Sequence, residues 1–276
     1  MDRYVVAGNP VEHSQSPFIH AEFAQQTAQA MTYGRQLWPI GGFAESVRTL
    51  AASGAKGCNI TVPFKFDAFR EGKRLTARAR LAEAANVLRF DAEGWLADNT
   101  DGVGLVNDIE RNAGVALAGL RVLLIGAGGA AAGALGPLLA ARPQTVVVAN
   151  RTLDKAQSLI ERHRPVAGTA LLRAAPLDDC GTDFDIVINA TASSMQGVAA
   201  PVTAAVLKDG ALALDMMYGA AARPFVAWAT THGARGRDGL GMLVEQAAAA
   251  FELWRGVRPD TAPVLAALRA RMDGAA

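Results

Sequence analysis

Short apolar segments alternate with helix-like segments along the whole chain. The apolar runs Tyr4–Ala7 and Gly57–Thr61 have the length of strands, and Pro63 ends the second because proline cannot continue a central ladder. A helix is expected from about Pro17. Strands that alternate with helices predict an α/β protein with mostly parallel sheets.

A hairpin and then a change of composition follow. The strand-like segments Asn86–Phe90 and Trp95–Ala97 flank the turn sequence 91–94, which predicts antiparallel pairing. After Asp101-Gly102 comes an amphipathic helix, and then a short linker over Gly114–Gly119. The composition changes around residues 101–120, which makes this region the best candidate for a domain boundary.

A second series of strands and helices begins after the linker. Arg121–Ile125 is a continuous run of Val, Leu and Ile, as expected for a strand covered on both faces. Thr145–Ala149, Asp185–Asn189 and Ala211–Asp215 repeat this pattern. A long Ala-rich helix is expected from Gly241 to about residue 255, and another from residue 261 onward.

The strand Arg121–Ile125 runs directly into the sequence Gly126-Ala127-Gly128-Gly129-Ala130-Ala131. This spacing matches the G-x-G-x-x-G/A turn that binds dinucleotides. Gly126 permits the tight turn, and Gly128 lets the backbone approach a pyrophosphate. A Gly-rich turn is weak evidence alone, but this one lies between a strand and a helix, where the mechanism requires it. The pattern therefore predicts a Rossmann-like, doubly wound dinucleotide-binding domain.

The end of the next strand indicates which dinucleotide is bound. Thr145–Ala149 is followed by Asn150-Arg151-Thr152, with Lys155 shortly after. An NAD site usually has an acidic residue here for the ribose 2′-hydroxyl, and this chain has none. Arg151 offers a fork of donors to a 2′-phosphate, and Lys155 adds a second cation. The alternative is a solvated arginine at a helix start; we expect NADP.

Composition limits the other partners. The 276 residues include 27 Lys and Arg against 26 Asp and Glu, so there is no electrostatic reason to expect a nucleic acid or a membrane surface. Val122–Ala141 is uncharged and long enough to span a membrane. Its Gly, Ala and Pro content favours a buried strand, turn and helix instead.

Cysteines and histidines predict no redox or metal chemistry. Cys58 and Cys180 are far apart, and we expect two buried thiols in a reducing compartment. The four histidines are not grouped, so no metal site is predicted, and His163, among charged residues, is expected to face solvent. Met1 leads into an apolar strand without a secretory pattern, so we expect a cytoplasmic protein, either monomer or homodimer.

Three polar clusters in the first part of the chain could carry chemistry. In the first, GNPVEHSQSP, Ser16 followed by Pro17 is typical of a helix N-cap, although hydroxyls at a helix start also suit a carboxylate ligand. The second, NITVPFK, places Thr61 and Lys65 beyond the carboxyl end of a strand. The third, DNTDG, is also a common turn before a helix. Each cluster alone is ambiguous.

Together the clusters resemble the shikimate dehydrogenase family over almost the whole chain. The segments that carry this resemblance are GNPVEHSQSP, NITVPFK, AANVL, DNTDG, GAGGA, NRT and GLGMLVEQ. The resemblance implies the reversible reduction of 3-dehydroshikimate to shikimate with NADPH in chorismate and aromatic amino acid biosynthesis. It also implies a substrate-binding domain formed by residues 1–101 and 239–276, with an NADP-binding domain over residues 102–238.

The same resemblance implies roles for individual residues. Lys65 and Asp101 would be the catalytic pair, because hydride addition to a ketone leaves an alkoxide that must gain a proton. The substrate would be bound at its carboxylate and hydroxyls by Ser14, Ser16, Tyr218, Thr61, Asn86, Asp101 and Gln246. The cofactor would be bound by Gly126, Ala127, Gly128, Gly129, Ala130, Asn150, Arg151, Thr152 and Lys155, with Met216, Gly239 and Met242 bordering the nicotinamide.

The chain departs from the family pattern at two places. Family members commonly have Asn-Ala-Thr-Ser-x-Gly where this chain has Ala192 and Ser194 in the fourth and sixth places, and Thr-Pro is frequent where it has residues 219–224.

The alternatives to this interpretation are a quinate/shikimate dehydrogenase with relaxed cofactor use, a non-catalytic NADP- or shikimate-binding regulator, and an unrelated NADP oxidoreductase. Arg151 and Lys155 favour NADP, and the presence of both Lys65 and Asp101 disfavours a regulator.

Overall fold

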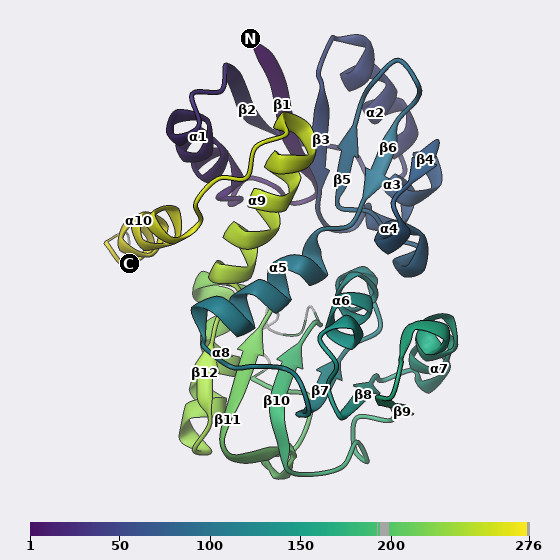
Figure 1. Cartoon of the computed structure of the whole chain (residues 1–276), viewed down its shortest axis with the longest axis vertical. Helices are drawn as coiled ribbons and strands as arrows, with labels where there is room; N and C mark the ends of the chain where they lie inside the picture. The colour runs from purple at the N-terminus through teal and green to yellow at the C-terminus, as the bar shows by residue number, and fades with distance from the viewer. Residues whose placement is uncertain (192, 194–198, 275–276) are drawn as a thin grey trace. The chain divides into compact units, whose positions relative to one another are not determined.

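The computed structural model describes residues 1–191, 193 and 199–274 (Figure 1). The chain divides into two compact units. Unit 1 consists of Met1–Gly104 and Leu243–Ala276, and unit 2 consists of Leu105–Met242. Each unit contains one six-stranded sheet with helices, so the predicted α/β class is confirmed.

The sheet of unit 1 has the strand order β2-β1-β3-β5-β6-β4. Its strands are β1 (Asp2–Gly8), β2 (Met31–Leu37), β3 (Gly57–Ile60), β4 (Arg74–Leu75), β5 (Val87–Arg89) and β6 (Leu96–Asp98). Strand β1 pairs in parallel with β2 and β3, and β4 with β6, whereas β5 is antiparallel to both β3 and β6. The predicted hairpin is the β5–β6 pair, so this sheet is mixed.

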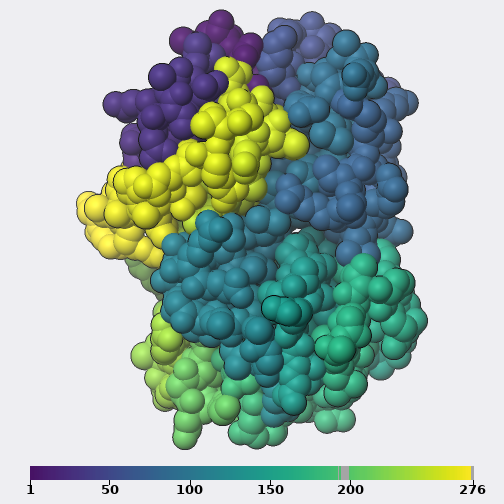
Figure 2. Space-filling model, in the orientation of Figure 1, coloured from purple at the N-terminus to yellow at the C-terminus, as the bar shows by residue number. Residues whose placement is uncertain are grey.

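Helices of unit 1 bury their apolar sides against this sheet and one another. They are α1 (Ser16–Gln26), α2 (Phe43–Ala52), α3 (Lys65–Glu71), α4 (Ala77–Ala82) and α10 (Ala262–Asp273). Helices α5 (Asp101–Asn107) and α9 (Leu240–Arg255) contain the two unit boundaries. Helix α2 buries Phe43, Val47 and Leu50, which share one helical face. Figure 2 shows the C-terminal segment, in yellow, packed against the purple N-terminal segment.

Unit 2 contains a fully parallel sheet with the order β12-β11-β10-β7-β8-β9. Its strands are β7 (Arg121–Ile125), β8 (Thr145–Ala149), β9 (Leu171–Ala175), β10 (Phe184–Asn189), β11 (Leu207–Asp215) and β12 (Arg235–Arg237). The order reverses between β7 and β10, which makes this the switch point where open α/β sheets bind ligands. The central strands are buried on both faces, as their continuous apolar sequences predicted.

The helices of unit 2 include α7 (Leu153–His163), whose last residue, His163, was expected to face solvent. Among the described residues they are α6 (Gly129–Ala140), α7 and α8 (Arg223–Thr231), with a π-helix at Asp108–Asn112 and 3₁₀ turns at Arg164–Val166, Ala204–Val206 and Gly219–Ala222. The prediction that His163 faces solvent was wrong. It is fully buried, and its Nδ1 lies 2.9 Å from the carbonyl oxygen of Leu159. One helical turn separates the two residues, so His163 shares the buried face of α7 despite its charged neighbours.

Other expectations agree with the structure. Cys58 and Cys180 are buried free thiols, as predicted. The uncharged stretch 122–141 forms β7, a turn and α6. Across the described residues, no helix combines the length and the apolar character that crossing a membrane requires.

Candidate active site

The two serines of the first polar cluster lie together before and at the start of α1. The hydroxyl of Ser14 lies 3.1 Å from that of Ser16. The interpretation of Ser16 as an N-cap was wrong, because the N-cap is Gln15 and no side chain caps this helix end. Ser16 is instead the first residue of the helix. Its hydroxyl accepts from the hydroxyl of Ser14 and makes no capping hydrogen bond to a backbone N–H of α1. The pair presents hydroxyls at a helix N-terminus, which suits an anion.

Lys65 and Asp101 form a partly buried ion pair. Nζ of Lys65 lies 2.6 Å from Oδ2 of Asp101, and the two side chains are 15% and 7% exposed. Lys65 opens α3 and Asp101 opens α5. A cation is unfavourable at a helix N-terminus and a carboxylate is favourable there, so Asp101 compensates the placement of Lys65. An ammonium group has three donors, and this contact occupies one of them.

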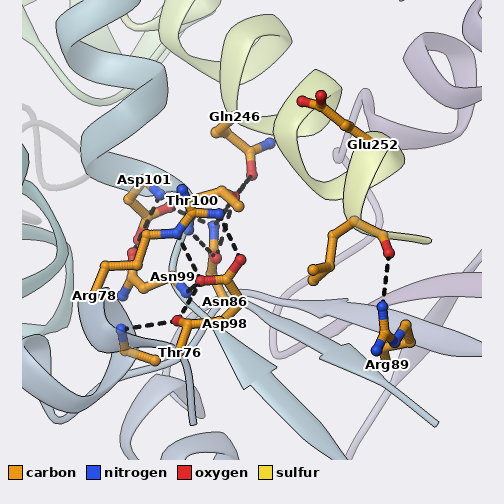
Figure 3. A network of polar contacts seen from close by, with 12 residues as sticks. Thr76, Arg78, Asn86, Arg89, Asp98, Asn99, Thr100, Asp101, Gln246 and Glu252 are labelled. Atoms are coloured by element: carbon orange, nitrogen blue, oxygen red, sulfur yellow. Dashed lines mark hydrogen bonds and ion pairs between the residues drawn. The ribbon is translucent and has the colours of Figure 1, made fainter. Parts of the chain in front are cut away.

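A buried hydrogen-bond network surrounds Asp101 (Figure 3). Nδ2 of Asn86 donates to Oδ1 of Asp101 at 2.8 Å, and Oδ1 of Asn86 accepts from the backbone of Thr100 at 2.8 Å. Oε1 of Gln246, on α9, lies 3.2 Å from Nδ2 of Asn86 and 3.3 Å from the Thr100 hydroxyl. The structure therefore brings together four predicted site residues, Lys65, Asp101, Asn86 and Gln246.

The sequence alone indicates no role for Thr100, although this residue lies inside the DNTDG motif. Its side chain is fully buried and touches the polar groups of both Asn86 and Gln246. Asn99, also in the motif, accepts a hydrogen bond from the backbone of Asp101 at 3.1 Å and donates one to the carbonyl of Ala84 at 2.9 Å. The polar residues of this motif thus hold the backbone from which Asp101 projects.

A second ion pair anchors the same motif. Asp98 is fully buried and accepts two hydrogen bonds from Arg78, at 2.5 and 2.6 Å, and one from Thr76 at 2.6 Å (Figure 3). Burial alone would raise the pKa of Asp98, but the hydrogen bonds and charge of Arg78, with those from Thr76 and the Asn99 amide, outweigh it and lower the pKa. The carboxylate is therefore ionised at neutral pH.

Thr61 follows β3 and packs against the carboxyl end of β1. A Cβ at Gly8 would lie 2.3 Å from Cγ2 of Thr61, so glycine is required there for this approach. In the same sheet, the hydroxyl of Tyr33 donates to Oδ1 of Asn59 at 2.6 Å, and burial raises the pKa of Tyr33 well above 10.0. Tyr33 was not identified from the sequence, because it lies in a strand without a recognisable motif.

The Gly-rich turn of unit 2 has the features that a dinucleotide requires. Gly126 has a φ of +112°, a conformation that favours glycine, and its backbone N–H donates to the carbonyl of Ala149 at 2.7 Å. Gly128, the N-cap of α6, has no atom within 4 Å of the position of an added Cβ. The backbone of the turn is thus open to a close ligand, at the N-terminus of a helix.

The segment after β8 carries the two predicted cations. Arg151 and Lys155 are exposed, and neither makes a side-chain hydrogen bond or ion pair with any residue that the structure describes. Nδ2 of Asn150 bonds to the carbonyl of Thr152 at 2.8 Å, which shapes this loop. Arg151 also borders a hollow of about 490 Å³, whose lining among the described residues includes Pro176, Leu177, Asp178, Ala200, Pro201, Val202 and Thr203.

The segments after β11 and β12 come close to one another. The backbone N–H of Gly239 donates to the carbonyl of Met217 at 2.8 Å, and a Cβ at Gly239 would lie 2.5 Å from the carbonyl oxygen of Met216. Met242 is buried at the start of α9, and Tyr218 is partly buried before a 3₁₀ turn. Ala192 and Ser194 lie outside the described residues. Among the described residues, no group of His, Cys, Asp or Glu could hold a metal ion.

Three family descriptions match successive parts of the chain. Residues 6–88 match the shikimate dehydrogenase substrate binding domain, residues 108–216 match shikimate/quinate 5-dehydrogenase, and residues 239–269 match the shikimate 5′-dehydrogenase C-terminal domain. A shikimate dehydrogenase (NADP(+)) from Methylibium petroleiphilum is 62% identical over 282 residues, covering 99% of this chain and 96% of that protein. The chain belongs to the shikimate dehydrogenase family.

Solved structures of similar proteins have the same fold. A shikimate 5-dehydrogenase from Thermus thermophilus, in complex with NADP(H) and shikimate, matches with a TM-score of 0.83 at 28% identity, covering 98% of this chain and 99% of that one. The Ael1 enzyme from Pseudomonas putida matches with a TM-score of 0.87 at 44% identity, covering 97% and 98%. The family resemblance and the fold predicted from the sequence are thus confirmed.

Proposed function

We propose that this shikimate dehydrogenase family member catalyses the reversible reduction of 3-dehydroshikimate to shikimate with NADPH, as a step of chorismate and aromatic amino acid biosynthesis. The observation that carries the proposal is the Lys65–Asp101 ion pair, in which an ammonium group is held at 2.6 Å and keeps two further donors. The relatives named shikimate dehydrogenase (NADP(+)) support the reaction and the cofactor.

The residues of unit 2 fit NADP. The open backbone at Gly128 admits a pyrophosphate, and the N-terminus of α6 favours its negative charge. Arg151 and Lys155 supply positive charge for the 2′-phosphate, because no described residue neutralises either side chain. The remaining cofactor contacts are proposed for Ala127, Gly129, Ala130, Asn150, Thr152, Met216, Gly239 and Met242.

The chemistry divides between cofactor and protein. NADPH, when bound, supplies the hydride that reduces the ketone carbon. Lys65 stabilises the negative charge that develops on the ketone oxygen and then gives this oxygen a proton from Nζ, so that an alcohol results. In the reverse direction, neutral Lys65 accepts this proton. Asp101 keeps Nζ in place through Oδ2 while Asn86 holds Oδ1.

The other polar groups orient the substrate. We assign Ser14, Ser16 and Tyr218 to its carboxylate, and Thr61, Asn86, Asp101 and Gln246 to its hydroxyls. Residues 1–101 and 239–276 then form the substrate-binding part of the chain, and residues 102–238 form the NADP-binding part.

We also propose a cytoplasmic location, because the two buried free thiols support a reducing compartment. For the oligomeric state, we propose a monomer or homodimer.

Steady-state kinetics with shikimate and quinate, each with NADP and with NAD, test the proposal. We expect turnover with shikimate and NADP, detected as absorbance of the reduced nicotinamide. Comparable rates with quinate or NAD would favour the quinate/shikimate alternative. Binding of shikimate without any turnover would overturn the proposed reaction and favour a regulator.

A further inference from the structure

A pair of buried polar side chains joins the carboxyl ends of β10 and β11. Asn189 and Asp215 are register partners in this parallel pair, and both are fully buried. Nδ2 of Asn189 donates to Oδ2 of Asp215 at 3.1 Å. A buried carboxylate is costly unless donors surround it, so this pair requires an explanation beyond the packing of the sheet.

Each member of the pair also holds the loop that follows its own strand. Oδ1 of Asn189 accepts from the backbone N–H of Thr191 at 3.1 Å and from its hydroxyl at 2.7 Å. Oδ1 of Asp215 accepts from the backbone N–H of Met217 at 2.8 Å. Both side chains thus bond to the backbone two residues ahead, which sets the direction in which each loop leaves the sheet.

These two loops touch the segments assigned to the cofactor. A Cβ at Gly126, in the phosphate-binding turn, would lie 3.1 Å from Cγ2 of Thr191. The carbonyl of Met217 accepts the hydrogen bond from the backbone N–H of Gly239, and the carbonyl oxygen of Met216 occupies the space that a Cβ at Gly239 would need. Thr191 therefore packs on the turn for the pyrophosphate, and the loop after β11 supports the residues proposed to border the nicotinamide.

We propose that Asn189 and Asp215 are positioning residues for NADP, which act through Thr191 on the phosphate-binding turn and through Met217 on the nicotinamide border. This inference rests on the proposed role of unit 2 in cofactor binding. Neither side chain is assigned a contact with the cofactor. The pair adds a side-chain link to the backbone hydrogen bond that Met216 donates to the carbonyl of Asn189 at 2.9 Å.

The donors and acceptors of the pair have a fixed direction. Asp215 only accepts, and Asn189 accepts from Thr191 while it donates to Asp215. In Asp215→Asn, the new amide oxygen accepts from the backbone N–H of Met217. The new NH₂ group then faces the NH₂ group of Asn189, so two donors meet. Asn189→Asp brings two carboxylates together. The exchange N189D/D215N restores the match between the two side chains: position 215 then donates to position 189, and both positions keep an oxygen for their loops.

The exchange provides the test. NADP dissociation constants of the wild type, Asn189→Asp, Asp215→Asn and the exchange variant are measured by calorimetric titration, together with the KM values for NADP and shikimate. We expect each single substitution to weaken NADP binding by roughly tenfold or more, with little change in the KM for shikimate, and the exchange to restore most of the affinity. Asp185→Asn is the control, because Asp185 lies at the opposite end of β10 and bonds Arg121 and Lys208.

Two results would overturn the inference: single variants that bind NADP as tightly as the wild type, or an exchange variant that binds no better than the single ones. If position 189 or 215 does not tolerate substitution, Thr191→Val, which removes the hydroxyl donor, is compared with Thr191→Ser, which keeps it. Only the valine variant should bind NADP more weakly. Wild-type protein that binds NADP without oxidising shikimate would count against the proposed reaction alone, since the titrations still test the pair.

Discussion

Lys65 and Asp101 are 36 positions apart in the chain, and Nζ of the lysine lies 2.6 Å from Oδ2 of the aspartate. The contact places a positive charge and a negative charge at the first residues of two helices, α3 and α5. A lone ammonium group at a helix start is destabilised by the helix dipole. The aspartate offsets this effect and fixes the direction of the lysine side chain.

Replacing Lys65 by methionine removes the proposed proton donor while keeping most of the side chain's volume. We expect kcat for shikimate oxidation to fall by roughly 10²- to 10⁴-fold, the usual contribution of a positioned acid or base. The dissociation constant for NADP, measured by titration, should not change. Lys56→Met, at an exposed lysine of the same unit, serves as the control. A Lys65→Met variant with near wild-type kcat would remove Lys65 from the mechanism.

Arg151→Ala should weaken the binding of NADP but not the binding of NAD. The substitution removes a guanidinium whose charge no described residue neutralises, and charge-assisted bonds to a phosphate are strong. We expect KM for NADP to rise roughly tenfold or more and KM for NAD to stay unchanged, because NAD has no 2′-phosphate. The ratio of kcat/KM for the two cofactors is the measurement, and Arg111→Ala, at another exposed arginine of unit 2, is the control. A parallel loss with both cofactors would place Arg151 elsewhere on the nucleotide.

Asp98→Asn should destabilise the fold at neutral pH. Breaking a buried ion pair costs about 3 kcal/mol or more, and Asp98 is fully buried beside Arg78. The folded-state pKa of Asp98 is below its ordinary value of 3.8. Its contribution is therefore present above that value and is lost as the pH falls through the folded-state pKa. Denaturant unfolding at a series of pH values should show the variant and wild type converging in acid.

The exposed pair Asp67–Arg70 provides the comparison for that experiment. Asp67→Asn should change the free energy of unfolding by less than about 1 kcal/mol, as is usual for surface ion pairs. A destabilisation by Asp98→Asn that persists unchanged below the folded-state pKa would show that the lost charge is not its cause.

His20 should make the protein sensitive to mild acid. Burial lowers its pKa from 6.5 to about 3, and the ring stacks on Tyr33 with centroids 4.1 Å apart. Below pH 6.5 the unfolded chain binds a proton that the folded protein excludes, so the free energy of unfolding falls by up to about 1.4 kcal/mol per pH unit. His20→Phe should remove this slope between pH 6.5 and the lower pKa. His232→Gln, at an exposed ring, should leave the slope as it is, and an unchanged slope in His20→Phe would refute the assignment.

The sequence predicted the central strands and missed all four edge strands. The predicted strands correspond to β1, β3, β5 and β6 of unit 1 and to β7, β8, β10 and β11 of unit 2. The missed strands are β2 and β4, and β9 and β12, which lie at the two edges of each sheet. An edge strand is covered less than a central one. Strands such as Arg235–Arg237 therefore carry polar residues and lack the apolar run that identifies a buried strand.

By itself the sequence determined the α/β class, the Gly-rich turn and the motifs that place the chain in its family, because these depend on residues that are neighbours in the chain. Tertiary structure decided which distant side chains meet. Asn86 and Gln246 are separated by 160 positions and hydrogen bond at 3.2 Å, and Asn189 and Asp215 are joined only by the register of β10 and β11. A sequence pattern records periodicity and local turns, whereas such contacts depend on the order and register of the strands, which packing fixes.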